Sequence, residues 1–183
     1  MWAISKKEWT HYFGSLTGFL VICFYLLANS LFLFVLPNFN VLDFGYASLQ
    51  VYFDYAPWFL LLLVPAITMR SFSEELRQGS FELLMSLPIS PLQMVLGKLM
   101  GVIMILAIAL APTLLYGIAL DQLSSTGGLD WGATAGAYWG LFLLASVYAA
   151  VGIFASAITK QALVALLVSI SICIFLYKGF DWI

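Results

Sequence analysis

Five long apolar runs divide the chain, and the charged residues lie almost entirely between them. The runs cover residues 15–36, 56–69, 99–120, 135–158 and 161–177. A helix that crosses a membrane needs about 20 apolar residues, and the short second run reaches this length if it begins near Tyr52. Because lipid offers no partner to unpaired backbone groups, the pattern predicts an all-α, polytopic transmembrane helix bundle with five visible spans.

The composition agrees with lipid as the main solvent of this chain. Hydrophobic residues make up 63% of the 183 residues and charged residues only 9%, whereas a soluble domain carries about 25% charged residues. The net charge of -2 argues against a nucleic-acid partner, which requires a basic surface. Cys23 and Cys173 lie inside apolar runs and are interpreted as small hydrophobic residues. No cleavable signal peptide is evident, so the first run is expected to be a retained span.

The basic residues predict how the bundle is oriented. If the N-terminus is cytoplasmic, six of the seven Lys and Arg residues lie on the cytoplasmic side, as the positive-inside rule requires: Lys6, Lys7, Arg70, Arg77, Lys98 and Lys160. Several aromatic residues then gather near the outer boundary and are expected to form an interfacial belt: Tyr52, Tyr55, Trp58, Trp131 and Tyr138. The sequence therefore predicts a multi-pass protein of the bacterial inner membrane.

The polar stretch 71–90, between the second and third spans, is the most informative part of the chain. Ser80 is expected to cap a short helix that carries Glu82 in its first turn, where the helix dipole favours an acid. The proline that follows ends this helix, and Leu83 and Leu84 lie on its apolar face. The stretch therefore predicts a short amphipathic helix.

Two interpretations of this helix remain open: it anchors the loop in lipid headgroups, or it docks into a protein. Helices that lie on membranes are usually rich in Lys and Arg, whereas this stretch offers Glu74, Glu75 and Glu82 against Arg77. The cytoplasmic leaflet is itself anionic. The charges therefore favour a protein partner.

The start of the third span is predicted by its own local signal. Ser90 suits the N-cap, Pro91 suits the first helical position, and Gln93 completes a capping box. A corner of this kind is rigid enough to transmit a push from the loop to the span.

The N-terminal segment 1–13 is a second amphipathic candidate on the cytoplasmic side. Trp2 and Trp9 are expected to lie in the membrane interface, while Lys6 and Lys7 meet lipid phosphates. A plain membrane anchor is the simpler interpretation, and a specific binding surface is the alternative.

The sequence shows no catalytic, cofactor-binding or metal-binding motif. It has no phosphate loop of the Gly-x-x-x-x-Gly-Lys-Ser/Thr type, so the chain is expected not to be an enzyme, and any ATPase activity would belong to a partner. His11 is the only histidine and has no second metal ligand nearby. No charged residue lies in the middle of a predicted span, where ion-coupled carriers normally place one.

Small and polar residues within the spans indicate how helices pack. Gly132, Gly136 and Gly140 recur every four residues, a spacing that lets helix backbones approach closely. Packing within the chain is the first interpretation, and an interface with a second copy or partner subunit is the alternative. Asn29 lies in the middle of the first span and is expected to form a hydrogen bond with another helix.

A set of charged and glycine positions in the loop and its flanks carries a family resemblance. They are residues 5–9, Arg70, Glu74, Glu75, residues 79–84, residues 88–90, Gly97 and Lys98. Their order resembles that of the ABC-2-type transporter permeases, and among these the gliding-motility-associated permeases. The resemblance implies that residues 1–183 form a single ABC-2-type transmembrane domain. Family members have six spans with both ends in the cytoplasm, so a sixth, C-terminal span is expected to be missing here.

The resemblance also implies roles for both cytoplasmic segments. Residues 71–90 would form the coupling loop, whose helix contacts a cytoplasmic ABC ATPase subunit that binds ATP and magnesium. The contact residues would be Glu74, Glu75, Gly79, Ser80, Glu82, Leu83 and Leu84. Residues 1–13 would form an interface helix against the bundle, with Trp2, Lys6, Lys7, Glu8 and Trp9. A second permease half, identical or different, and membrane lipid would be the further partners.

The function expected from these observations is that of a permease subunit of an ATP-driven exporter. Within this class, the complex would move a solute or act mechanically in a motility or secretion apparatus. The alternative is a membrane scaffold or mechanotransmission subunit of an envelope complex that transports nothing. An intramembrane enzyme is disfavoured, because no span carries a paired nucleophile and base.

Overall fold

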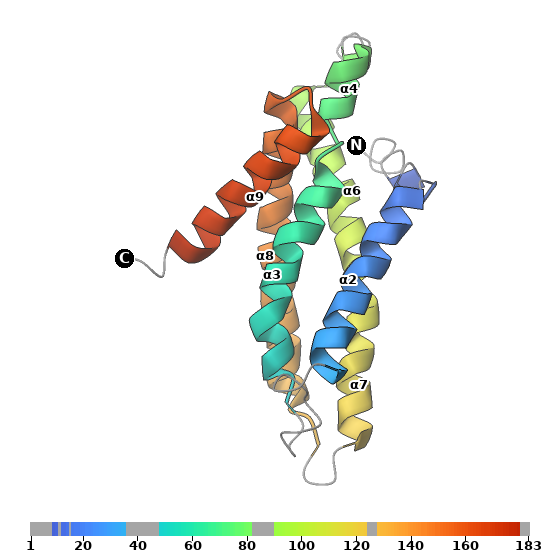
Figure 1. Cartoon of the computed structure of the whole chain (residues 1–183), viewed down its shortest axis with the longest axis vertical. Coiled ribbons are helices and arrows are strands. Elements are labelled where there is room, and N and C mark those ends of the chain that lie inside the picture. Colours follow the sequence, from blue (N-terminus) through green and yellow to red (C-terminus); the bar gives the residue numbers. More distant parts are fainter. Residues whose placement is uncertain are drawn as a thin grey trace.

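The computed structural model describes residues 9–10, 12–14, 16–35, 48–81, 90–123 and 128–179, which form a helical bundle (Figure 1). Its elements are α2 (Leu16–Phe34), α3 (Gln50–Thr68), α4 (Ser73–Gln78), α6 (Pro91–Leu110), the 3-10 helix η2 (Ala111–Thr113), α7 (Leu114–Leu123), α8 (Trp131–Ile158) and α9 (Ala162–Lys178). The predicted all-α membrane bundle is therefore confirmed.

Helix α3 lies at the centre of the bundle and contacts α2, α8 and α9. Its residues Leu60 and Val64 are fully buried, and α6 packs beside it against α8. Helix α9 folds back from the end of α8 and leans away from the bundle toward its C-terminal end (Figure 1). The core consists of apolar side chains from helices that are far apart in the sequence.

The described residues contain three helices that are long and apolar enough to cross a membrane: Gln50–Gln78, Pro91–Leu123 and Trp131–Ile158. Two shorter apolar helices, Gly18–Phe34 and Ala162–Lys178, match the first and fifth predicted spans. The second span begins at Gln50, as its short apolar run requires, and keeps both of its prolines inside the helix. The chain is therefore a multi-pass membrane protein.

The third span starts at the predicted corner. The Ser90 hydroxyl accepts a hydrogen bond from the backbone N–H of Gln93 at 3.3 Å, and the Gln93 carbonyl oxygen accepts one from the Ser90 N–H at 3.3 Å. Pro91 occupies the first turn. Because the helix begins here, Lys98 lies about two turns inside it and is buried. Lys98 is one of the basic residues that the positive-inside rule assigns to the cytoplasmic side, where an exposed side chain is expected. The structure buries it instead.

A proline interrupts the third span in the half of the bundle that lies away from α4. Helix α6 gives way to η2 at Pro112, and α7 continues from there. The Tyr52 hydroxyl donates to Thr113 Oγ1 at 3.1 Å, and the Tyr138 hydroxyl donates to the Thr113 carbonyl at 2.8 Å. Tyr52 is thus a core residue and not part of the expected aromatic belt, whereas Trp58 and Trp131 remain exposed.

The charged residues separate toward the two ends of the bundle. Arg70, Arg77 and Lys160 line one depression at the α4 end. At the opposite end, Asp121 accepts a hydrogen bond from the Leu129 N–H at 2.8 Å, and Asp130 caps α8. This separation supports the predicted orientation, in which the α4 end faces the cytoplasm.

Candidate functional site

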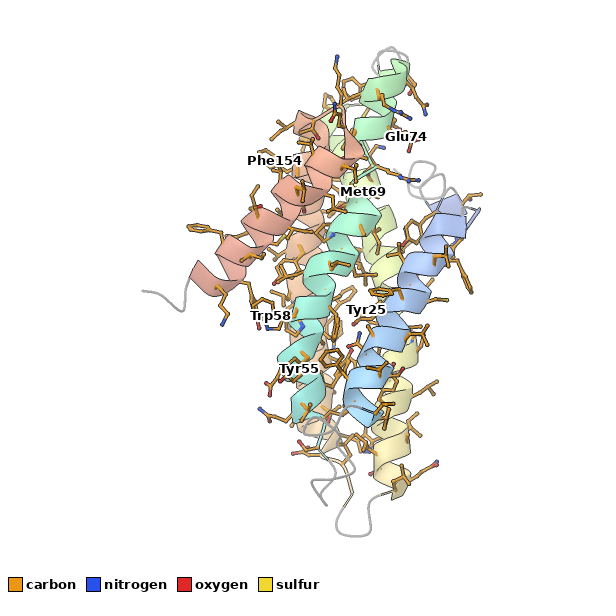
Figure 2. The ribbon with its side chains drawn as sticks, viewed as in Figure 1. Tyr25, Tyr55, Trp58, Met69, Glu74 and Phe154 are labelled. Carbon is orange, nitrogen blue, oxygen red and sulfur yellow. The ribbon has the colours of Figure 1, made fainter. Side chains whose placement is uncertain are left out.

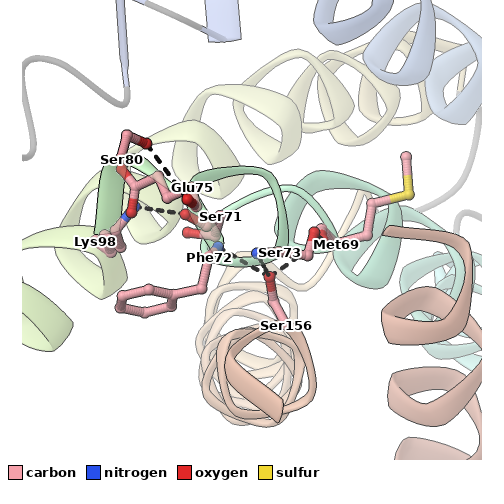
Figure 3. Close-up of polar contacts among 8 residues, drawn as sticks. All are labelled: Met69, Ser71, Phe72, Ser73, Glu75, Ser80, Lys98 and Ser156. Carbon is pink, nitrogen blue, oxygen red and sulfur yellow. Dashed lines mark hydrogen bonds and ion pairs between the residues drawn. The ribbon is translucent and has the colours of Figure 1, made fainter. Parts of the chain in front are cut away.

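The site is built around the elbow where the chain leaves α3 and enters α4. Ser156 of α8 organises this elbow: its Oγ accepts hydrogen bonds from the N–H groups of Phe72 at 2.9 Å and Ser73 at 3.0 Å. The same hydroxyl donates to the Met69 carbonyl at 3.1 Å, and Ser73 Oγ donates to that carbonyl too (Figure 3). A side chain from a distant helix therefore replaces the local cap that α4 lacks.

Lys98 of α6 fixes the elbow from its other side. Its ammonium lies 3.0 Å from Oε2 of Glu75 and donates a hydrogen bond to the Ser71 carbonyl. The nitrogen also lies 4.6 Å from the centre of the Phe72 ring, where a cation is attracted by the π system. Since only 1% of Lys98 is exposed, these partners replace the water that its side chain loses on burial. Lys98 therefore ties α4 to α6 (Figure 3).

Helix α4 is short because a glycine ends it. Gly79 has φ of 72°, a left-handed conformation that glycine adopts without strain. Beyond it, Ser80 Oγ donates to the carbonyl of Glu75 in α4 at 3.4 Å. The sequence prediction of a helix beginning at Ser80 did not include this preceding helix.

An apolar groove of about 410 Å³ lies under α4. Its walls come from α4 and its flanks, α6 and α8: Phe72, Leu76, Phe81, Pro91, Met94, Val95, Leu99, Ala150, Ile153, Phe154 and Ala157. Phe72 and Phe81 meet edge to face, with ring centres 6.3 Å apart. The elbow is thus fixed by polar contacts and lies over an apolar groove.

The structure separates the predicted contact residues into different roles. Gly79 is exposed at the end of the bundle, and Glu74 and Ser80 are half-buried. Glu75 instead points inward to Lys98, with 15% of its side chain exposed. The remaining predicted contacts, Glu82, Leu83 and Leu84, lie outside the described residues.

Of the predicted interface helix, the structure describes only the end. The Trp9 ring lies against Phe13, with centres 5.1 Å apart, and a Cβ on Gly18 would collide with Tyr12. This end therefore packs tightly on α2. The other predicted residues, Trp2, Lys6, Lys7 and Glu8, lie outside the described residues.

The glycines chosen for close packing have no closely packed helix against them in the part of the chain that the structure describes. Gly132, Gly136 and Gly140 are exposed, and a Cβ on Gly136 or Gly140 would meet no atom within 4 Å. The close approach occurs further along α8, at Gly152, where an added Cβ would lie 2.8 Å from Thr68 Cβ and closer still to Thr68 Oγ1. The alternative role of Gly132, Gly136 and Gly140, in an interface with another subunit, stays a prediction.

Asn29 also differs from its prediction. It is buried, but its Nδ2 donates to the Tyr25 carbonyl at 2.8 Å, within α2 itself. The expected hydrogen bond to another helix is not among those that the described residues show for it.

Sequence reasoning missed three residues that organise the site: Lys98, Ser156 and Gly152. Lys98 gave a signal, because a lysine about two turns after a well-formed N-cap must lie on the helix and find partners. Ser156 and Gly152 lie in a long apolar helix where small residues are common, and nothing local distinguishes them. In the described parts of the chain, no three His, Cys, Asp or Glu side chains come together as a metal site requires.

The role of Ser156 can be tested by removing its hydroxyl. Ser156→Ala leaves the buried N–H groups of Phe72 and Ser73 without their acceptor, so we expect a loss of about 2 kcal/mol in unfolding free energy. Ser146→Ala is the matched control, because Ser146 Oγ bonds only within α8, to the Phe142 carbonyl. Thermal unfolding in detergent measures both variants, and equal melting temperatures would contradict the assigned role.

Comparison with known proteins identifies the class of this bundle. The model of the ABC-2 family transporter proteins matches residues 2–183, nearly the whole chain. Neither the curated proteins nor the solved structures contain a significant match. Members of this family work with an ABC ATPase subunit, and the elbow lies at the end of the bundle predicted to face the cytoplasm. The chain therefore belongs to the ABC-2 transporter family and is a membrane permease subunit of an ABC transporter.

Proposed function

We propose that this permease belongs to an exporter of the inner membrane, and that a separate cytoplasmic ATPase subunit drives it through the elbow between α3 and α6. The observation that carries the proposal is the double attachment of α4. Lys98 joins it to α6, and Ser156 joins the turn before it to α8. A force on α4 therefore reaches two membrane helices at once.

The energetics of Lys98 make this attachment stiff. Separating α4 from α6 would break the ion pair of Lys98 with Glu75 and its hydrogen bond to the Ser71 carbonyl, and hydrogen bonds to charged groups contribute about 1.5–3 kcal/mol each. The two helices are therefore expected to move together. The Ser90 capping box fixes the start of α6, so the chain enters this helix at a defined corner.

The ATPase would contact the outer side of this elbow. Gly79 is exposed there and Glu74 is half-buried, and the following residues Glu82, Leu83 and Leu84 extend the proposed contact. No phosphate loop occurs in this sequence. ATP and magnesium would therefore be bound by the ATPase subunit and not by this chain. A second permease half would complete the pathway, as a homodimer or heterodimer.

Charge reversal at the elbow tests the coupling. Glu74→Lys, and separately Glu82→Lys, are expected to weaken binding of the ATPase at least tenfold, because each turns an acidic contact into a like-charge or mismatched one. Co-purification from detergent and stimulation of ATP hydrolysis in reconstituted vesicles measure the effect. Asp54→Lys, the same charge change near the opposite end of α3, is the matched control and is expected to leave both readouts unchanged.

Two outcomes would decide against the proposal. If both reversals leave ATPase binding unchanged, the elbow is not the contact. If wild-type chain retains the ATPase but never changes its turnover, the alternative function, a scaffold or mechanotransmission subunit of an envelope complex, is favoured.

A link to gliding motility or secretion is part of the same proposal. It is supported by the resemblance of residues 5–9 and of the loop 71–90 to the gliding-motility permease GldF. Deletion of the gene that encodes this chain is expected to abolish spreading of cells on a surface. Expression of the wild-type protein should restore spreading, and expression of the Glu74→Lys variant should not. Normal spreading of the deletion strain would exclude this role while leaving the exporter open.

A further inference from the structure

A second depression lies beside the elbow, on the side that faces the turn between α8 and α9. It has a volume of about 440 Å³ and is lined by Arg70, Ser73, Glu74, Arg77, Lys160, Gln161, Ala162 and Leu163. Figure 2 shows Glu74 at this end of the bundle, beyond Met69 at the end of α3. Three cationic side chains face one carboxylate here, so the depression is electropositive.

These cations are not used by the fold. Arg70, Arg77 and Lys160 are all exposed, and none of them forms an ion pair within 4.0 Å in the part of the chain that the structure describes. Lys98, by contrast, forms an ion pair with Glu75. Like charges gathered in a hollow lower the energy of an incoming anion, so the depression is suited to an anionic ligand.

The position of the depression fits the headgroup layer of a membrane. Arg70 follows directly on the last turn of α3, and Lys160 lies between the end of α8 and the start of α9. The ends of three membrane-embedded helices therefore meet at this level. Basic residues at the cytoplasmic ends of membrane helices lie close to lipid phosphates.

One wall of the depression continues as an apolar surface along α9. Leu163 lines the depression and is 73% exposed, and Leu167, one turn further, is 63% exposed. Ile174, on the same face of the helix and near its other end, is 41% exposed. A ligand that fills the depression and follows this wall needs an anionic head and a long apolar tail.

We propose that this depression binds the headgroup of an anionic phospholipid, with its phosphate among Arg70, Arg77 and Lys160 and an acyl chain along Leu163 and Leu167. Basic pockets between membrane helices on the cytoplasmic side hold such headgroups in general. The lipid would bridge the elbow and the α8–α9 turn, so the anionic lipid content of the membrane would stabilise the arrangement of α4.

Native mass spectrometry of the full chain in detergent tests the proposal, with phosphatidylglycerol and phosphatidylcholine as probes. We expect wild-type chain to retain phosphatidylglycerol at least tenfold better. Each of Arg70→Gln, Arg77→Gln and Lys160→Gln should weaken this binding about fivefold, and the triple variant about a hundredfold, since each basic residue near the surface contributes about a factor of five. The side chains are exposed, so circular dichroism is expected to show unchanged helix content.

Matched controls separate this site from other causes. Lys178→Gln removes the same charge from the far end of α9 and is expected to bind as wild type, while Arg77→Lys is expected to retain most of the binding. Leu163→Asn should weaken lipid binding severalfold without changing any affinity for inorganic phosphate. Loss of ATPase binding in the triple variant, with lipid binding unchanged, would assign the depression to a protein partner and overturn the proposal.

Three further results would also overturn it: a triple variant that binds lipid as wild type does, an equal loss in Lys178→Gln, or equal retention of both lipids. If millimolar inorganic phosphate displaces phosphatidylglycerol and Leu163→Asn has no effect, the ligand is a free anion and the lipid assignment is wrong. The proposal does not rest on the exporter function, because its readout is lipid binding by the isolated chain.

Discussion

Lys98→Met is expected to lower the unfolding free energy of the protein by about 3–5 kcal/mol, the usual consequence of removing one partner of a buried ion pair. The methionine fills a similar volume but leaves the inward-facing Glu75 carboxylate without its cation and the Ser71 carbonyl without its donor. Thermal unfolding in detergent, followed by tryptophan fluorescence, measures the loss. Stimulation of the ATPase is expected to fall with it, because α4 and α6 are no longer joined.

A second substitution distinguishes stability from coupling. In the double variant Lys98→Met, Glu75→Gln the buried charge is removed together with its partner, so most of the lost stability is expected to return. Coupling to the ATPase is expected to stay impaired, since a neutral pair holds α4 to α6 less firmly than the ion pair does. Recovery of both properties would show that Lys98 matters only for folding.

Lys178→Met provides the control for the charge itself. Lys178 is exposed near the end of α9, with its nitrogen 5.6 Å from the centre of the Trp58 ring, and such an exposed cation–π contact is worth at most about 1 kcal/mol. A small effect here and a large one at position 98 would confirm that burial decides the outcome. A wild-type melting temperature for Lys98→Met would refute the proposed attachment.

Sequence patterns predicted the elements of this fold well because membrane helices are defined locally. Each span is a long apolar run, and the start of α6 was specified by three neighbouring residues, Ser90, Pro91 and Gln93. The interruption at Pro112 and the buried position of Tyr52 were not predicted. Whether an aromatic residue faces lipid or the core depends on its neighbours in space, which periodicity does not reveal.

The role of the loop as the functional site stays a prediction, and the contacts within it were not predicted from the sequence. The loop was singled out by its charges, and the structure shows Glu75 facing Lys98 where an outward contact was expected. A lysine at the edge of an apolar run signals orientation equally well whether it is exposed or buried. Lys98 is buried because Ser71, Phe72 and Glu75 lie against it in the folded bundle, and these contacts between distant segments are not visible in the local sequence.

The glycines of α8 also show that sequence spacing alone does not predict contacts between helices. A regular spacing of four residues defines a face of a helix, but it does not show whether another helix covers that face. Gly136 and Gly140 lie on an open face of α8, whereas the isolated Gly152 is pressed against α3. The close approach of α8 to Thr68 of α3 thus occurs at one glycine that no repeat distinguishes.

Gly152→Ala is accordingly expected to destabilise the protein by about 3 kcal/mol, at the upper end of the range for an overpacked core. The added methyl group would lie 2.8 Å from Thr68 Cβ, 3.3 Å from Ser169 Oγ and closer still to Thr68 Oγ1. These atoms belong to side chains of α3 and α9, and because Thr68 Cβ is bonded directly to the α3 backbone, α3 must shift away from α8 to admit the methyl group. Thermal unfolding in detergent measures the cost.

The same helix supplies both a control and a rescue for this prediction. Gly136→Ala adds its methyl group to open space, and alanine is the better helix former by about 0.5–1 kcal/mol, so the melting temperature is expected to stay level or rise. Thr68→Ala removes the nearest obstacle, and in the double variant it is expected to recover part of the loss. If Gly152→Ala melts no lower than Gly136→Ala, helices α3 and α8 do not meet as closely as the structure places them, and the elbow that begins one turn beyond Thr68 loses its support from α8.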